Sequence, residues 1–271
     1  MSQLSFRLAT RVLLAPLGGR GGLLGGRFNT REGEENKVVG DRIQQIESYV
    51  RQAMSTVTAP DLRIAHDFKH VDRVRGWALR LASGEAIQNL DLIEATALLH
   101  DIGLTRVEVE QRSQHAQVGA EIAAQFLLEH QLFSEEEIGI ITDAILCHSS
   151  PCGGGTLGEI LRDADKLDAL GAVGIMRAFT SKYAKPEYTL QDVRGDTWEM
   201  TMGGFEERFA EGKGIGDYII DQVNFQISFY GELHTETAKQ IGKPLVEFMK
   251  AYVIQLDSEI NATQMQGQQK P

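Results

Sequence analysis

Two histidine-aspartate pairs in this 271-residue chain have the residue types and spacing to bind a metal ion. The first pair, His66-Asp67, opens the segment HDFKHVDRV, which also contains His70. The second pair, His100-Asp101, directly follows the apolar run ATALL. Polar groups at the buried end of an apolar helix need partners, because burying an uncompensated charge is costly. A divalent cation would be such a partner, so we expect His100-Asp101 to be the central pair.

Two further segments could complete this site. The helix that carries HVDRV could add the neutral imidazole of His70, and RDADKLDALG could add the carboxylate of Asp165. With His100 and Asp101 they would form a mixed set of nitrogen and oxygen ligands in the core of a helical bundle. Such a set keeps open positions for water and a substrate phosphate. It therefore indicates hydrolysis rather than a closed structural site.

Three sequence contexts in this order, HVDRV, ALLHDIG and DADKLDALGAVGI, resemble those of the HD-domain metal-dependent phosphohydrolases. The resemblance covers roughly residues 60 to 180. Beyond it, FYGELHTETAKQIGKPLVEFMKAYV looks like the C-terminal helices of a subgroup that resembles bacterial nucleotide pyrophosphohydrolases. The resemblance implies that the metal ligands are His70, His100, Asp101 and Asp165.

Three further residues are expected to be catalytic: His115, His148 and Lys166. Along the chain, the two histidines stand in the same order as the residues that bind a second metal in dinuclear HD proteins. They could instead bind phosphate or act as a general acid, and we favour one cation with both histidines in the pocket. Lys166 follows the last ligand and could meet a phosphate, or it could be a solvated lysine. Leu104 and Thr105 stand where several HD hydrolases have an acidic residue, so no motif identifies the group that activates water.

Substrate binding is assigned to Arg73, His66 and Asp168. Arg73 lies about one helical turn beyond His70. His66 precedes His70 by four residues and shares its helix face, so we place it in the pocket rather than on the metal. Asp168 could also orient a ligand or cap a helix.

A helical scaffold must position these groups, and from residue 41 onward apolar residues repeat at helical spacing without sustained strand alternation. Ser134 and Glu137 predict a capping box. Helical patterns cover 91–101, 114–130, 134–147, about 157–180 and about 234–260. Scattered glycines and Pro186 predict that residues 184–216 form a long, partly mobile excursion between helices. We predict an all-α fold, an HD-domain helical bundle with additional C-terminal helices, over residues 37–260, with the metal-site core at about 60–180 and a disordered tail at 261–271.

The first 36 residues form a separate predicted segment. Residues 1–31 contain five arginines but no lysine, and the first acidic residue is Glu32. An arginine-rich, acid-poor start is typical of a mitochondrial transit peptide, and the alternative is a disordered cytosolic segment. We therefore expect the mitochondrial matrix, with the cytoplasm as the alternative location.

The net charge of −11 argues against a nucleic-acid groove, and no apolar stretch approaches the ~20 residues of a membrane span. We expect a small phosphate-bearing partner, a nucleotide first, and leave a homo-oligomer open. The predicted reaction is metal-dependent hydrolysis of a phosphoester or phosphoanhydride bond. Mn²⁺ is the first choice, with Fe²⁺, Mg²⁺, Co²⁺ or Zn²⁺ as alternatives. The alternative functions are a di-iron oxygenase that uses His115 and His148, and a non-catalytic nucleotide-binding metal module.

Overall fold

The computed structural model describes residues 30–57, 66–150 and 153–265. Within them every regular element is helical, which confirms the all-α prediction. The α-helices are α1 (Thr30–Met54), α3 (Phe68–Gly84), α4 (Leu90–Leu99), α5 (His115–Glu129), α6 (Glu135–Leu146), α7 (Gly155–Asp168), α8 (Gly171–Ser181), α9 (Met202–Ala210), α10 (Ile219–Ser228) and α11 (Glu236–Met265). Three short 3-10 helices are η1 (Ile102–Thr105), η2 (Val109–Gln114) and η3 (Phe229–Glu232).

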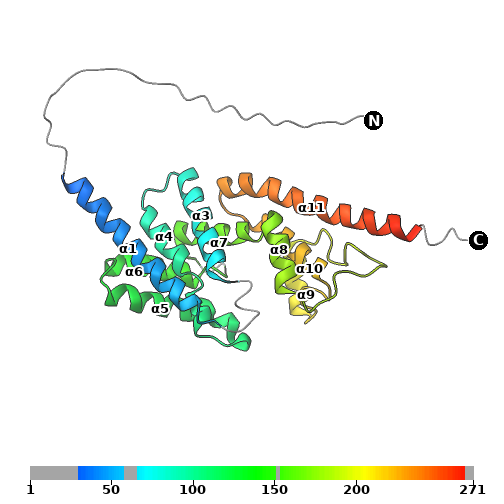
Figure 1. The fold of residues 1–271 in the computed structure, drawn as a ribbon, viewed down its shortest axis with the longest axis horizontal. Helices are drawn as coiled ribbons and strands as arrows, with labels where there is room; N and C mark the ends of the chain where they lie inside the picture. Colours follow the sequence, from blue (N-terminus) through cyan, green and yellow to red (C-terminus); the bar gives the residue numbers. More distant parts are fainter. Residues whose placement is uncertain (1–29, 58–65, 151–152, 266–271) are drawn as a thin grey trace, which may run out of the picture.

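Two hydrophobic clusters hold the helices together. The first unites α1, α5 and α6 through side chains such as Ile46, Leu127 and Ile141. The second unites α7, α10 and α11 through side chains such as Ile160 and Val223. Helices α3 and α4 contribute to both clusters. Figure 1 shows the result: α1 and α3 to α6 form one group, α8 to α11 form another, and α7 runs between them.

The capping box predicted at the start of α6 is confirmed, with Ser134 and Glu137 bonded reciprocally. The single helix predicted at about 157–180 is wrong, because the chain breaks it into α7 and α8 at Gly171. Gly171 has a φ of +68°, which suits glycine and strains other residues. A Cβ there would also lie 3.0 Å from Cδ2 of Leu245 on α11. The break turns α8 across α11.

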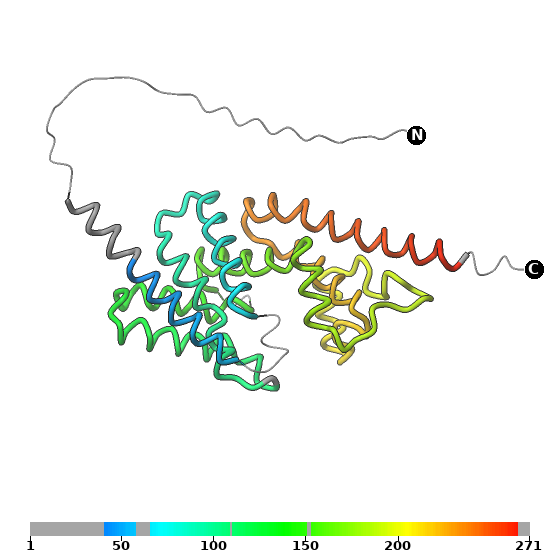
Figure 2. The backbone as a smooth tube through the Cα atoms, in the orientation of Figure 1, coloured from blue at the N-terminus to red at the C-terminus, as the bar shows by residue number. Residues whose placement is uncertain are grey.

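The excursion predicted at 184–216 carries the short helix α9 and is tied to α10 by a buried polar network. Asp221 accepts hydrogen bonds from the hydroxyl of Thr197 at 2.7 Å and the backbone amide of Tyr218 at 3.0 Å. Asn224 donates to the carbonyl of Arg194 at 2.7 Å. These bonds fasten the segment against the second cluster. The tube in Figure 2 shows it folded beside α8 and α10.

The ends of the chain differ from the predicted boundaries. Helix α1 already begins at Thr30, and α11 continues to Met265, beyond the predicted end at 260. Of the segment predicted at 1–36, residues 1–29 lie outside the described residues, as do residues 266–271 of the tail predicted at 261–271, so the mitochondrial location stays a prediction. Residues 30–36 and 261–265 are helical, so the disorder predicted there is wrong. In the part of the chain that the structure describes, no helix combines the length and the apolar character needed to cross a membrane.

Replacing Gly171 by alanine should lower the free energy of unfolding by about 1–3 kcal/mol, because alanine is strained at a positive φ and crowds Leu245. Urea unfolding of the two proteins measures this difference. Gly76→Ala is the matched control: a Cβ there meets nothing within 4 Å, and alanine favours a helix interior. Equal stability of Gly171→Ala and the wild type would contradict the expectation.

Candidate metal centre and its cavity

The structure brings together the four residues expected to bind a metal. His70 lies on α3, His100 and Asp101 follow the last residue of α4, and Asp165 lies on α7. Nε2 of His70 is 3.4 Å from Nε2 of His100 and 3.3 Å from Oδ1 of Asp165. Oδ2 of Asp101 lies 3.4 Å from Nε2 of both histidines. We call these four residues the first ligand group.

Asp101 also faces a second pair of histidines. Its Oδ1 lies 3.7 Å from Nε2 of His115 at the start of α5 and 3.7 Å from Nε2 of His148 after α6. The two Nε2 atoms are 3.0 Å apart. Asp101, His115 and His148 could therefore hold a cation of their own, and we call them the second ligand group. One carboxylate thus presents an oxygen to each group.

The hydrogen bonds of the histidines decide which ring nitrogen faces the site. Nδ1 of His100, His115 and His148 each lies 2.6–2.7 Å from a backbone carbonyl three residues earlier. A carbonyl can only accept, so Nδ1 carries the proton and donates it. In the neutral imidazole Nε2 then keeps a lone pair, as a metal ligand requires.

The facing Nε2 atoms need a positive charge between them, because two lone pairs at this separation repel each other. Ligands about 2.1 Å from a common cation lie about 3.0–3.4 Å apart in octahedral or tetrahedral geometry. The separations of 3.4 Å between His70 and His100 and 3.0 Å between His115 and His148 fit this range. The residues of the site therefore fit a divalent cation.

Local sequence explains how these side chains reach one another. Asp67, in the dipeptide that opens HDFKH, caps α3 by accepting the backbone amide of His70 at 3.1 Å. Gly103 lets η1 touch the start of α5, since a Cβ there would lie 2.0 Å from the carbonyl oxygen of His115. This close approach brings His115 next to Asp101.

Asp168, expected to bind substrate, lies behind His70. It is 1% exposed, and its Oδ2 accepts a hydrogen bond from Nδ1 of His70 at 2.7 Å. Arg73 donates two bonds to the same carboxylate at 2.6 and 3.1 Å, and Arg177 donates one at 2.7 Å. Asp168 and Arg73 are absent from the lining of the cavity described below. The geometry suits them to orienting His70.

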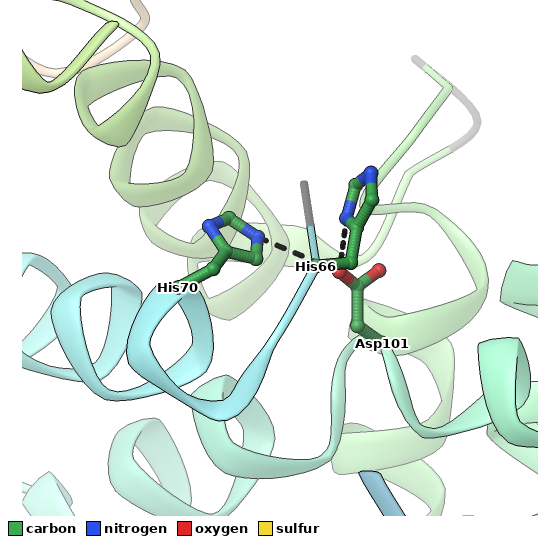
Figure 3. Close-up of side chains that lie close together, drawn as sticks. All are labelled: His66, His70 and Asp101. Atoms are coloured by element: carbon green, nitrogen blue, oxygen red, sulfur yellow. Dashed lines mark hydrogen bonds and ion pairs between the residues drawn. The ribbon is translucent and has the colours of Figure 1, made fainter. Parts of the chain in front are cut away.

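His66 approaches the site from the segment before α3. Its Nδ1 lies 2.6 Å from Oδ2 of Asp101, and its Nε2 contacts Arg112. Figure 3 shows His66 and His70 meeting the Asp101 carboxylate from two directions. His66 could join His70 and Asp101 around a cation, although its hydrogen bonds occupy both ring nitrogens. The structure places His66 in the cavity wall, where we expected it.

The buried charges shift each other's pKa values. Burial alone would raise the pKa of Asp101, but the imidazoles of His100 and His66 hold it well below its usual range. Burial would lower the pKa of His100, yet Asp101 raises it to about 9. For His66 burial prevails and lowers the pKa to about 4. In a cation-free site at neutral pH, a proton on His100 thus balances the carboxylate.

A cavity of about 750 Å³ opens beside the cluster, and Asp165 and His148 reach into it from the ligand groups. Its wall includes five basic side chains, namely Arg112, Arg162, Lys166, Arg177 and Lys182, against three acidic ones, namely Asp165, Glu206 and Glu232. Lys166 is where we expected it, and burial lowers its pKa. The other expected catalytic residue, His115, sits behind His148.

Sequence reasoning missed several residues of this wall. Arg162 and Arg177 lie close to the DADKLD motif, and their charge was the available signal. His234 and the apolar side chains of α10 and η3 carry no motif. They line the same cavity as Asp165 and His148 because α10 and α11 pack against α7 and α8.

Comparison with known proteins agrees with the helical architecture. Residues 67–170 match the model of the HD domain family. YpgQ of Bacillus subtilis is 26% identical over 232 residues, which cover 80% of this chain and 93% of YpgQ. Its crystal structure in complex with ADP has a TM-score of 0.55 at 22% identity, covering 82% of this chain and 96% of that one.

Two further solved structures share this architecture. An HD-superfamily hydrolase of Bacillus thuringiensis has a TM-score of 0.58 at 24% identity, and the match covers 83% of this chain and 99% of that one. A protein predicted to be an HD-superfamily hydrolase, from an uncultured Thermotogales bacterium, has a TM-score of 0.53 at 28% identity. That match covers 80% and 91% of the two chains.

Cation binding at pH 7 should release at least one proton, because a metal ligand must be a neutral imidazole, the pKa of His100 is about 9 without a cation, and hydrogen bonds to Asp101 and Asp168 also raise the pKa of His70. Affinity should therefore rise with pH up to about 9 and fall in acid. Titration calorimetry with Mn²⁺ in two buffers of different ionisation enthalpy counts the protons. An affinity that stays constant over this range would contradict the assignment.

Proposed function

We propose that this chain, whose residues 67–170 match the HD domain family, is a metal-dependent phosphohydrolase that cleaves a phosphoester or phosphoanhydride bond of a nucleotide. The observation that carries this proposal is the contact between the first ligand group and the cavity. Asp165 belongs to both, so a molecule in the cavity meets the cation site directly. A closed structural metal site would have no such opening.

His70, His100, Asp101 and Asp165 would hold the cation. Their two imidazoles and two carboxylates suit Mn²⁺ first, with Fe²⁺, Co²⁺, Mg²⁺ or Zn²⁺ as alternatives. When bound, the cation would polarise a phosphoryl oxygen and lower the pKa of a nearby water molecule. The protein fixes the geometry: α3, the segment that follows α4, and α7 would each supply ligands, and Asp168 keeps His70 turned toward the others.

The charge of the cavity wall supports a phosphate-bearing substrate. The whole chain has a net charge of −11, yet basic side chains outnumber acidic ones by five to three in the wall. Arg162 and Lys166 lie on α7 beside Asp165, where they could bind phosphate oxygens. A cluster of basic groups in an acidic protein attracts anions and repels cations.

The remaining wall supports a nucleotide in particular. Phe225 of α10 and Phe229 of η3 line the cavity with Met202 and Ile215, and they offer apolar surface to a base. A volume of about 750 Å³ lies within the range of small-molecule sites, about 300–1,000 Å³. YpgQ, which shares the fold, has been solved with ADP. We infer that the phosphates face α7 and the base faces α10.

His100→Ala and Asp101→Ala should each lower metal-dependent phosphate release by more than about 100-fold, because even the partners of metal ligands contribute about 10–100-fold. The assay screens Mn²⁺-, Fe²⁺-, Co²⁺- and Mg²⁺-loaded protein against nucleoside mono-, di- and triphosphates. His130→Ala and Asp143→Ala are matched controls outside the two ligand groups and should remain active. Full activity in both ligand variants would refute the proposal.

A second candidate arrangement has two cations, one in each ligand group. The close approach of His115 and His148 to Oδ1 of Asp101 favours it, since bridging carboxylates allow paired cations. The same three residues would complete the di-iron centre of an oxygenase. Identification of the reaction products is therefore needed to distinguish hydrolysis from oxygen chemistry.

Metal analysis of the purified chain should give two cations per chain if the second ligand group is occupied, and His115→Ala should reduce this to one. One cation per wild-type chain would support the single-cation arrangement, in which His115 and His148 are pocket residues. Oxygen consumption with two irons and no phosphate release would support the oxygenase. Nucleotide binding without turnover by any metal form would support the non-catalytic module.

A further inference from the structure

His234 is a cavity residue held by a buried carboxylate. It lies between η3 and α11 and faces the same cavity as Asp165. Asp163 on α7, which is 0% exposed, accepts from Nδ1 of His234 at 3.1 Å and from its backbone amide at 2.8 Å. The other oxygen of Asp163 accepts from the amide and the hydroxyl of Thr235 at 2.7 and 2.8 Å. Four donors from one turn therefore fix the imidazole.

The bond to Asp163 settles the role of each ring nitrogen. A carboxylate accepts a hydrogen bond, so Nδ1 carries a proton and Nε2 is left for the cavity. Of the three histidines in the cavity wall, His66 uses its nitrogens on Asp101 and Arg112, and His148 uses its own on Ile145 and His115. Among the described residues, Nε2 of His234 meets no hydrogen-bonding partner.

The position of His234 separates it from the ligand groups. The hydrogen bonds and ion pairs of its ring join it to Asp163 alone and to none of the ligand histidines. Its neighbours are Glu232 and Lys166, whose Nζ donates to the carbonyl of Glu232 at 3.2 Å. His234 and Asp165 line one cavity from different elements, so a phosphoryl group bound at the cation site could turn its leaving oxygen toward His234.

We propose that His234 is the general acid of the reaction, oriented by Asp163; this inference rests on the proposed phosphohydrolase function. Water forms the new P–O bond and gives its proton to solvent. The bond from phosphorus to the leaving oxygen breaks, and its electron pair stays on that oxygen. The leaving oxygen takes the proton from Nε2 of protonated His234, which is recharged from solvent. Asp163 fixes the orientation of the ring, as a buried aspartate does for a catalytic histidine.

The test compares turnover of the best nucleotide phosphomonoester, whose alkoxide leaving group requires a proton, by the metal-loaded wild type, His234→Ala and His234→Gln. Both variants should lower kcat by about 100-fold or more, because glutamine can donate a hydrogen bond but cannot transfer a proton. KM and metal content should stay near the wild-type values. Hydrolysis of p-nitrophenyl phosphate, whose leaving group needs little protonation, should fall much less. His130→Ala removes a histidine outside this cavity and should match the wild type.

Two outcomes would overturn the assignment. A kcat restored in His234→Gln would mean that the side chain only binds or positions the substrate. Equal losses on the nucleotide and on p-nitrophenyl phosphate would mean that His234 acts on a step other than departure of the leaving group. Thermal unfolding of both variants near the wild-type temperature excludes a folding defect. A wild type without turnover of any phosphate compound would remove the proposed function itself.

Discussion

The structure of the site depends on the compensation of one buried charge, the carboxylate of Asp101. It is 2% exposed and ionised, so it requires compensating charge and hydrogen bonds from every side. His66, His100, His115 and His148 surround it from four segments of the chain. Apolar packing alone would not select this arrangement. The need to neutralise one buried anion sets where α3 and α5 begin and where α4 and α6 end relative to one another.

Helix α7 extends this constraint to the rest of the molecule. Three of its carboxylates serve different neighbours: Asp163 holds the turn before α11, Asp165 faces the cation site, and Asp168 holds His70. Successive residues of a helix turn by about 100°, so residues two apart point to nearly opposite sides. DADKLD therefore encodes two structural anchors and one ligand in less than two turns. The apolar face between them packs in the second cluster.

Much of the ligand set was predictable from the sequence, because each residue lies in a local context that reports burial or matches a family pattern. The helices were also predictable, because apolar residues that repeat at helical spacing mark the helix face that packs against the core. The break at Gly171 was not, because LDALGAVGI keeps helical spacing while the backbone turns left-handed. The partner of His234 was also hidden, since it lies 71 residues away and only the packing of α11 against α7 joins them. Asp168 was expected near substrate, but the turn of α7 directs it to His70.

Helix α7 runs between two groups of helices that contribute different parts of the site. One group contains α1 and α3 to α6, and the other contains α8 to α11. The helices of the first hydrophobic cluster place His70, His100, His115 and His148 around Asp101, whereas α8 to α10 and the excursion supply most of the apolar side chains that line the cavity. Changes in the second group can therefore alter which molecule fits without disturbing the buried anion and its histidines.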